Sequence, residues 1–223
     1  MGPARRERPS GRWASFAEEL AHHETLLQRA GPAASVALHR GRAVSFGVGV
    51  RPDAPYLFRA RDAGIPTVRR TSGGSGVLHL EGDLLWAVVL PRNDPRVGAD
   101  FTRAYGRLGR GVVTGLAAAG LRAAWVAAPG VADDYCFLSS RGEVLSVEGK
   151  VVGGAAQHLT SRALLHHGSV AWELDRPEID RLFDLAPGGP SACLGGLAEA
   201  ASRPDPTAIA QALARALDAE LTR

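Results

Sequence analysis

The chain has 223 residues, of which 45% are hydrophobic and 22% charged, a composition that is typical of a folded protein and excludes a largely disordered one. The formal net charge is only +3 and no basic stripe is interleaved with aromatic residues, so nucleic acid is not an indicated partner. No apolar run reaches the roughly 18 residues that a membrane-spanning helix needs, so no membrane is expected as a partner.

The predicted elements indicate a mixed α/β (α+β) fold in a single domain, residues 13–223, after a mobile polar arm at residues 1–12. In the first half, apolar spacing and turn residues predict a helix at 13–28, hairpin-like strands at 35–39 and 43–50 joined by residues 40–42, a short helix at 56–63, and strands at 65–70 and 77–90. In the second half they predict the longest helix at 100–121, a strand at 123–128, a loop at 130–140, strands within 143–174 broken at Gly149 and around Gly153 and Gly154, and helices at 175–185 and from Thr207 onward.

Lysine is almost missing from this chain. Of the 26 basic residues, 25 are arginine and one is Lys150. Arginine stays protonated near neutral pH and cannot act as a base or nucleophile, so a lysine that survives such a bias is a candidate for amine chemistry. A chance surface lysine explains the count equally well.

A glycine cluster in residues 68–79, VRRTSGGSGVLH, places two arginines, three hydroxyls and three glycines at the end of a predicted strand. Such a turn lets backbone amides approach a ligand closely, and the arginines favour a phosphate or a carboxylate. The cluster has neither the lysine of a P-loop nor the G-x-G-x-x-G order of dinucleotide folds, so a plain hairpin loop is an equal alternative.

The two cysteines, Cys136 and Cys193, lack metal-ligand spacing and no signal peptide precedes them, which predicts a reduced, cytoplasmic protein without a metal site. Cys136 lies in a predicted loop, where a thiol can act as a nucleophile if a cation stabilises its thiolate; a small buried side chain is the alternative. Cys193 lies in a Gly/Pro-rich link and is interpreted as structural.

The histidines offer few candidates for a site. His166 and His167 are neighbours on a predicted strand, so at most one of them faces any site. His79 directly follows the glycine cluster and is the better candidate. His22 and His23 are expected at the surface or the core edge of the first helix.

Two ordered motifs together resemble the lipoate protein ligase and octanoyltransferase family. Residues 68–84 are similar to its Arg-Arg-x-Ser-Gly-Gly-Gly-Ala-Val-x-His-x-x-Gly-Asn-Leu pattern, with Asp83 in place of the asparagine. Residues 148–157 and 167–170 resemble its Gly-Lys-Lys-Ile-x-Gly-Ser-Ala-Gln and His-Gly-Ser-Ile patterns.

The resemblance implies a fold shared with biotin protein ligases and the transfer of an eight-carbon acyl group to a lysine of a lipoyl carrier domain. It also implies a set of acyl-binding residues, namely Arg70, Ser72, Gly73, Gly74, His79, Gly153, Gly154, Ala155 and His167. Close backbone approach at glycine turns suits an alkyl chain, because it excludes water.

Two mechanisms divide the family, and the resemblance favours one of them. Ligases activate free lipoate with ATP and Mg²⁺ and commonly carry an Asn-Asp pair before the lysine strand, which is absent from the corresponding stretch, Arg141-Gly142-Glu143. Transferases take the acyl group from acyl carrier protein as a cysteine thioester and need no cofactor. Cys136 followed by Phe137 resembles the Cys-Phe pair of one octanoyltransferase branch, which implies that Cys136 is the nucleophile and that acyl carrier protein and lipoyl carrier domains are the partners.

The resemblance leaves two candidates for the position of the family's catalytic lysine. A gapless match puts Val151 at its position, and Lys150 takes that role only if the hairpin turn at Gly149 is one residue shorter and a bulge follows near Gly153. The alternatives are therefore a transferase with Cys136 and Lys150 in catalysis, an ATP-dependent ligase without its accessory domain, and a degenerate relative that binds lipoyl groups without chemistry.

Overall fold

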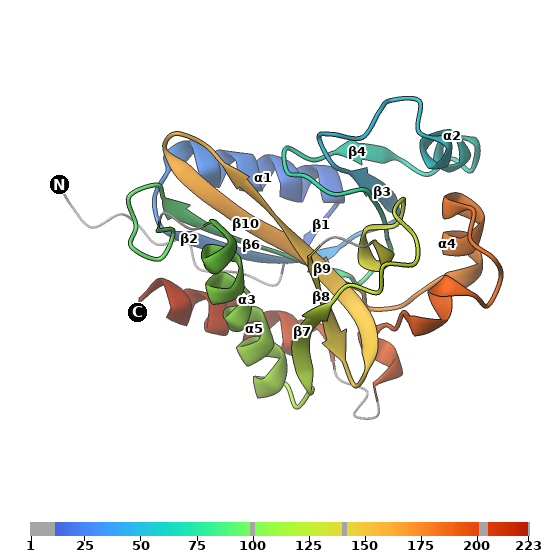
Figure 1. The fold of residues 1–223 in the computed structure, drawn as a ribbon. Coiled ribbons are helices and arrows are strands. Elements are labelled where there is room, and N and C mark those ends of the chain that lie inside the picture. The colour runs from blue at the N-terminus through green and yellow to red at the C-terminus, as the bar shows by residue number, and fades with distance from the viewer. Residues whose placement is uncertain (1–11, 99–100, 140–141, 201–204, 223) are drawn as a thin grey trace.

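The computed structural model describes residues 12–98, 101–139, 142–200 and 205–222 (Figure 1). The arm expected at residues 1–12 therefore lies, apart from Arg12, outside the described residues. No helix in these ranges is both long and apolar enough to cross a membrane.

A seven-stranded sheet forms the centre of the molecule. Its order is β1 (Arg12–Ala14), β2 (Ala33–His39), β6 (Leu84–Pro91), β10 (Ala163–Val170), β9 (Lys150–Leu159), β8 (Glu143–Val147) and β7 (Ala123–Ala127). Only β1 and β2 pair in parallel; the other pairs are antiparallel.

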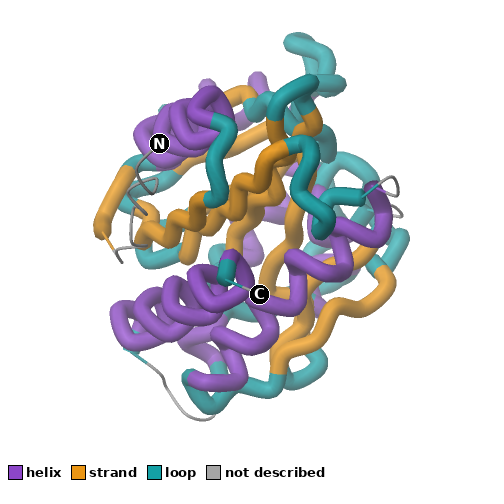
Figure 2. The backbone as a smooth tube through the Cα atoms, turned by 90° about the vertical axis from the view of Figure 1, so that its left-hand side faces the viewer, coloured by secondary structure: helices purple, strands orange, loops and turns teal. Residues whose placement is uncertain are grey.

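Helices cover both faces of this sheet (Figure 2). Helix α1 (Phe16–Arg29) packs on one face, while α3 (Phe101–Ala118) and α5 (Pro206–Leu221) pack on the other. Strand β6 shows how alternation supplies both cores, because Trp86 and Val88 pack toward α3 and α5 whereas Ala87 and Val89 pack toward α1. At 18 residues, α3 is the longest helix of the described chain, as predicted.

A second sheet of three strands lies beside the first, in the order β4 (Thr67–Arg69), β3 (Ala43–Phe46) and β5 (Gly76–His79). Helices α2 (Pro55–Asp62) and α4 (Arg176–Phe183) pack against each other at this end of the molecule (Figure 1). Tyr56, Tyr135 and Phe183 form the aromatic part of its separate core.

The hairpin predicted across residues 40–42 is wrong. Strand β2 pairs with β1 and β6, while β3 pairs with β4 and β5, so the two strands belong to different sheets. Gly41, with φ of +83°, turns the chain from one sheet to the other. The run at 77–90 is divided in the same way, because the turn before Asp83 separates β5 from β6.

Other element boundaries also differ from the prediction. The first helix begins at Phe16 because Ser15 and Glu18 form a capping box, and Trp13 lies in β1. The strand predicted at 43–50 ends at Phe46. Strand β9 runs through Gly153 and Gly154 without a break, because both residues pair with β10.

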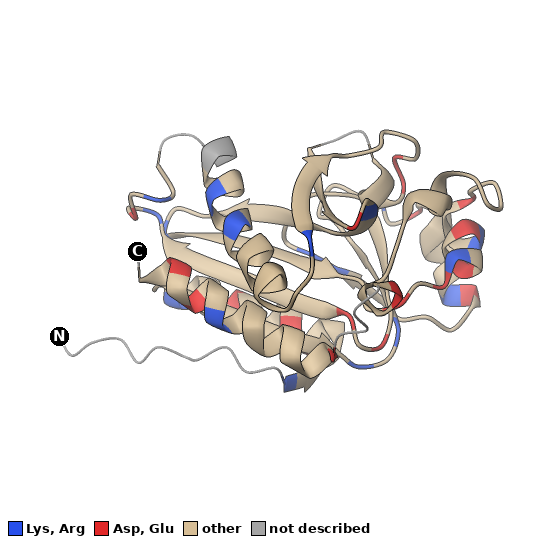
Figure 3. Cartoon of the chain, turned by 90° about the horizontal axis from the view of Figure 1, so that it is seen from below, with Lys and Arg blue, Asp and Glu red and all other residues tan. Residues whose placement is uncertain are grey.

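Two of the helices carry charged residues of both signs. In the view from below, acidic and basic positions are interspersed on α4 and α5 (Figure 3). Within the described residues, no group of three or more His, Cys, Asp or Glu side chains could hold a metal ion.

Candidate active site

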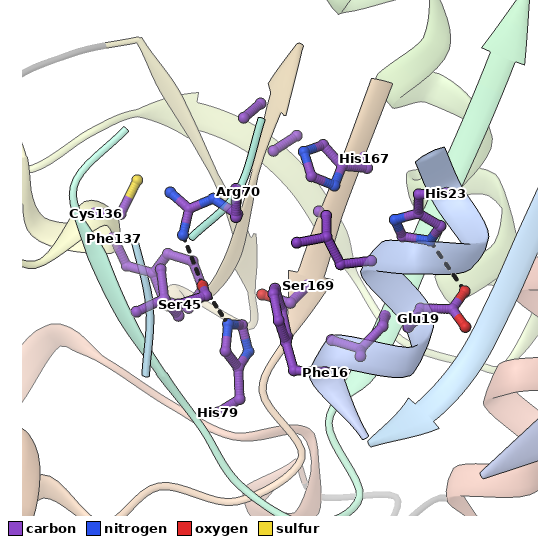
Figure 4. A pocket seen from close by; sticks show the side chains of 17 residues that line it. Phe16, Glu19, His23, Ser45, Arg70, His79, Cys136, Phe137, His167 and Ser169 are labelled. Atoms are coloured by element: carbon purple, nitrogen blue, oxygen red, sulfur yellow. Dashed lines mark hydrogen bonds and ion pairs between the residues drawn. The ribbon is translucent and has the colours of Figure 1, made fainter. Parts of the chain in front are cut away.

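A narrow cavity of about 50 Å³ lies between the two sheets and α1 (Figure 4). Most of its wall is apolar and includes Phe16, Leu20, Val77, Leu85 and Phe137 together with backbone and methyl groups of Gly154, Ala155 and Ala156. A few polar side chains also line it, namely Glu19, His23, Ser45, Arg70, His79, Cys136, His167 and Ser169. A mostly apolar pocket with few polar groups is typical of a small-molecule site.

Elements far apart in sequence bring these polar groups together. Strands β3 and β5 carry Ser45 and His79, and Arg70 follows β4. His167 extends from β10 into the pocket, whereas its neighbour His166 points to the other face and packs on the rings of Trp86 and Tyr105, at centroid distances of 5.1 and 4.9 Å. The alternation expected for the two histidines is therefore observed.

A hydrogen-bonded chain connects His79, Ser45 and Arg70. Arg70 Nη1 donates to Ser45 Oγ at 2.6 Å, and 2.8 Å separates Ser45 Oγ from His79 Nε2. Burial, assisted by the Arg70 charge, lowers the pKa of His79 to about 3, so its imidazole is neutral at pH 7. Asp83 Oδ2 lies 3.7 Å from His79 Nδ1, and burial raises the pKa of Asp83 to about 7 although two backbone amides donate to its carboxylate.

Cys136 begins the short 3-10 helix η1 (Cys136–Leu138) and is half-buried at one end of the pocket. A Cβ atom built on Gly74 would lie 3.1 Å from Cys136 Sγ, so the glycine turn leaves room beside the thiol that a side chain would fill. The other cysteine, Cys193, is outside the pocket; its thiol donates to the Pro190 carbonyl, and burial raises its pKa.

Ser72 and Gly73 of the glycine cluster do not line the pocket, but they form hydrogen bonds to residues that do. Ser72 is buried, and its hydroxyl is 2.7 Å from His167 Nε2. The Gly73 carbonyl accepts a hydrogen bond from Arg70. Gly153 serves strand pairing, because a Cβ there would lie 2.3 Å from the Ser169 carbonyl oxygen of β10.

The β8–β9 hairpin does not bring Lys150 to the pocket. Its turn consists of Glu148 and Gly149, with φ of +50° and +83°, and Val147 pairs with Lys150. The Lys150 side chain is exposed, and its amine donates to the Ala192 carbonyl at 2.9 Å. A bulge is present in β9 at Val152, and the two-residue turn leaves the Lys150 side chain at the surface.

Val151, the alternative for the lysine position, is buried in the second core. It lies against Leu194, and its carbonyl accepts from the Gly195 amide at 2.9 Å. Neither Val151 nor Lys150 lines the cavity that contains Cys136.

The sequence interpretation did not include Glu19 and His23 among the site residues, and it expected His23 at the surface or the core edge of the first helix. Both are buried on the pocket side of α1, where Glu19 accepts from His23 Nε2 at 3.0 Å, from Ser35 Oγ at 2.6 Å and from Arg12. Burial raises the pKa of Glu19, but these partners outweigh burial and hold it below the usual range. The i, i+4 spacing of Glu19 and His23 is the sequence signal that pairs them on one helical face.

Comparisons with solved structures define the class of fold. The chain resembles the crystal structure of a lipoate-protein ligase A bound with ATP, with a TM-score of 0.72, 22% identity, and coverage of 96% of this chain and 86% of that one. It also resembles a bi-partite lipoate protein ligase from Thermoplasma acidophilum, studied with its E2 lipoyl domain, with a TM-score of 0.68, 21% identity, and coverage of 96% and 84%. The architecture is that of lipoate protein ligases, as the sequence resemblance implied.

Residues 15–216 match the model of the lipoyl protein ligase A/B catalytic domain, and the chain belongs to this family. Curated relatives include the octanoyltransferase LipM of Macrococcus caseolyticus, 32% identical over 139 residues that cover 58% of this chain and 49% of the relative. The octanoyltransferase LipM of Bacillus subtilis is 34% identical over 128 residues, 53% of this chain and 44% of the relative. The chain thus spans about half the length of the curated relatives that it matches.

Proposed function

We propose that this chain is an acyltransferase of protein lipoylation, which moves an octanoyl or lipoyl group to a lysine of a lipoyl carrier domain through a thioester on Cys136. The observation that carries the proposal is the thiol of Cys136 at the wall of a mostly apolar pocket in a member of this family. The octanoyltransferase names of its relatives support the same reaction class.

The pocket chemistry suits such a transfer. Phe16, Leu20, Val77 and Leu85 offer apolar contact to an alkyl chain, while the polar groups near Cys136 face the acyl carbonyl. His79 and His167 are kept neutral by burial, which lowers the pKa of both, so neither places a charge against the apolar chain. Among the acyl-binding residues expected from the sequence, Arg70, His79, Gly154, Ala155 and His167 line this pocket.

The reaction proceeds in two steps. The Cys136 thiolate attacks the carbonyl carbon of the donor thioester, a new S–C bond forms, and the donor thiol leaves with a proton from solvent. The acceptor lysine amine then attacks the Cys136 thioester, an amide forms, the amine loses a proton, and the thiol of Cys136 is regenerated. Exchange of a thioester for an amide needs no external energy source, so the proposal requires neither ATP nor Mg²⁺.

The partners in this proposal are an octanoyl acyl carrier protein as donor and a lipoyl carrier domain as acceptor. The second is supported by the Thermoplasma structure, whose ligase was studied together with an E2 lipoyl domain. Intact-mass measurement after incubation with octanoyl acyl carrier protein tests the first step: an octanoyl adduct should form on the wild type, persist in Cys193→Ser and vanish in Cys136→Ser. Addition of a lipoyl domain should then discharge the adduct onto that domain.

Two other functions predict different results in the same experiment. An ATP-dependent ligase, which the resemblance also allowed, would show lipoate-dependent exchange of pyrophosphate into ATP and no adduct from the acyl carrier protein. One observation favours a non-catalytic relative: Val151, which a gapless match puts at the family lysine, is buried in the second core, and Lys150 lies outside the pocket. Such a relative would bind lipoate or a lipoyl domain equally well in Cys136→Ser and show no turnover.

A further inference from the structure

Arg70 is a buried cation that pairs with no acidic side chain among the described residues. Its side chain is only 7% exposed, and no carboxylate in the described part of the chain contacts it. An arginine keeps its proton at neutral pH even when burial lowers its pKa, as it does here. Burial of a charge without an opposite charge is costly. A negative group that approaches Arg70 is therefore attracted more strongly than it would be in water.

Hydrogen bonds hold this guanidinium in one orientation. Nη2 donates to the carbonyls of Gly73 and Ser75 at 3.1 and 3.0 Å, and Nη1 donates to Ser45 Oγ. Ser45 Oγ accepts from Arg70 and lies 2.8 Å from Nε2 of the neutral His79, so one hydroxyl connects the guanidinium to the imidazole. Ser45 and His79 are therefore positioning residues for Arg70.

The guanidinium and the thiol of Cys136 border the same small space above Gly74. A Cβ atom at Gly74 would lie 3.1 Å from Arg70 Nη2 and 3.1 Å from Cys136 Sγ. With φ of +95°, Gly74 leaves this space free of a side chain. Figure 4 shows the Arg70 guanidinium turned toward the sulfur at one end of the pocket.

The other candidate cations do not reach the thiol as charged groups. Burial holds the pKa of His79 and His167 far below neutral pH, so both imidazoles lack charge. Lys150 is bound to the Ala192 carbonyl, and its charge acts on Cys193.

Other titratable groups near Cys136 are tyrosines and acids. Three tyrosines lie close enough to interact electrostatically with Cys136, namely Tyr56, Tyr105 and Tyr135. Burial raises the pKa of each, so they stay neutral at pH 7. Its chain neighbours Asp133 and Asp134 are exposed, where solvent screens their charge.

We propose that Arg70 is the catalytic cation of this site, in the role that a lysine has in the family to which the chain belongs. The Cys136 thiol loses its proton to solvent, and Arg70 stabilises the resulting thiolate. When the sulfur attacks the thioester carbonyl, the S–C bond forms and the π electron pair moves to the carbonyl oxygen, which the space above Gly74 holds beside the guanidinium. The C=O bond then re-forms, and the donor leaves as a thiolate that takes a proton from water. This inference rests on the proposed function.

Alkylation of Cys136 by iodoacetamide tests the pairing without any acyl substrate. In a Cys193→Ser background, Arg70→Gln should slow alkylation at pH 7 by about tenfold or more, because a neighbouring opposite charge commonly changes thiolate stability by this amount. The rates should converge above about pH 9, where free cysteine also ionises. Arg70→Lys should alkylate faster at pH 7 than Arg70→Gln, and Arg69→Gln, an exposed neighbour, should react as the parent does.

A parent rate at pH 7 in a folded Arg70→Gln protein would overturn the inference. If Arg70→Gln does not fold, the ultraviolet absorbance of the thiolate in the parent protein tests the inference instead. A thiolate band at pH 7 that Cys136→Ser lacks would support the inference. A band that rises only where free cysteine ionises would overturn it. Arg70-dependent alkylation without an octanoyl adduct would reject the proposed function and leave the Arg70–Cys136 pairing intact.

Discussion

The glycine cluster at residues 68–79 and the β8–β9 hairpin carry the two sequence motifs, yet they contribute to the site very differently. From the first, Arg70 and His79 converge on the pocket through buried hydrogen bonds. From the second, Gly154 and Ala155 reach the pocket wall, whereas Lys150 points to solvent and Val151 is buried elsewhere. A buried polar network specifies side-chain direction because each unsatisfied group is costly, while one residue of turn length reverses every side chain of a hairpin.

Among substitutions in the glycine cluster, Gly74→Ala should reduce octanoyl transfer the most. The new methyl group would occupy the space between Arg70 and Cys136, in a backbone conformation with positive φ that costs about 1 kcal/mol for alanine. We expect octanoyl transfer to fall by roughly 100-fold or more, as for the loss of a main transition-state contact. The matched control is Gly73→Ala, which has open space for a Cβ, and equal activity in the two variants would contradict the comparison.

Low pH should destabilise the buried network. Burial lowers the pKa of His79 and His166 to about 3 and that of His39 to about 4, with an ordinary value of 6.5 in the unfolded chain. A lowered folded pKa gives stability that is complete above pH 6.5 and is lost as pH falls toward the folded value. Between these two pKa values, each group should lower the free energy of unfolding by about 1 kcal/mol for each unit that the pH falls.

Denaturant unfolding at pH 7 and pH 5 measures this loss. His79→Gln removes one of these groups, so its free energy of unfolding should fall less between the two pH values than that of the wild type. Lys150→Met serves as the control from the hairpin and should follow the wild type. Equal stability of the wild type at both pH values would refute the prediction.

Ser45→Ala should have a moderate effect, because it removes the link between Arg70 and His79. It leaves Arg70 Nη1 and His79 Nε2 without their partner in a buried site, which should cost about 1–3 kcal/mol of unfolding free energy. Cys136 alkylation at pH 7 should slow by a smaller factor than in Arg70→Gln. Ser75→Ala is the matched control, since Arg70 uses only the carbonyl of Ser75, and alkylation as slow in Ser75→Ala as in Ser45→Ala would argue against the link.

Lys150→Met should have the smallest effect. The exposed amine contributes one hydrogen bond to the Ala192 carbonyl, so stability should change by no more than about 0.5 kcal/mol and transfer by less than about twofold. Val151→Ala at the next position should cost about 1–2 kcal/mol, because it removes two buried methyl groups. A large loss of transfer in Lys150→Met would restore the lysine to the catalytic machinery.

Much of the fold could be predicted from local pattern. Helices α3 and α5 follow from their apolar spacing, and the start of α1 is specified by its capping box. The division of strands between two sheets could not be predicted, because β2 and β3 are near neighbours in sequence and their partners are distant. The role of His23 could not be predicted for a similar reason: its burial with Glu19 depends on the pocket beside α1, which distant segments complete.

By itself, the sequence determined the family, because residues 68–84, 148–157 and 167–170 resemble its motifs, and that resemblance implied part of the pocket, including Arg70, His79 and His167. Composition made the solitary lysine a candidate for amine chemistry, and only the tertiary structure placed its amine at the Ala192 carbonyl, outside the pocket. The reason is geometric, since the Glu148–Gly149 turn directs Lys150 to solvent while the chain brings Arg70 from another sheet beside Cys136. The cation that lies near a thiol is decided by contacts between distant segments of the chain, and a local sequence pattern does not specify such contacts.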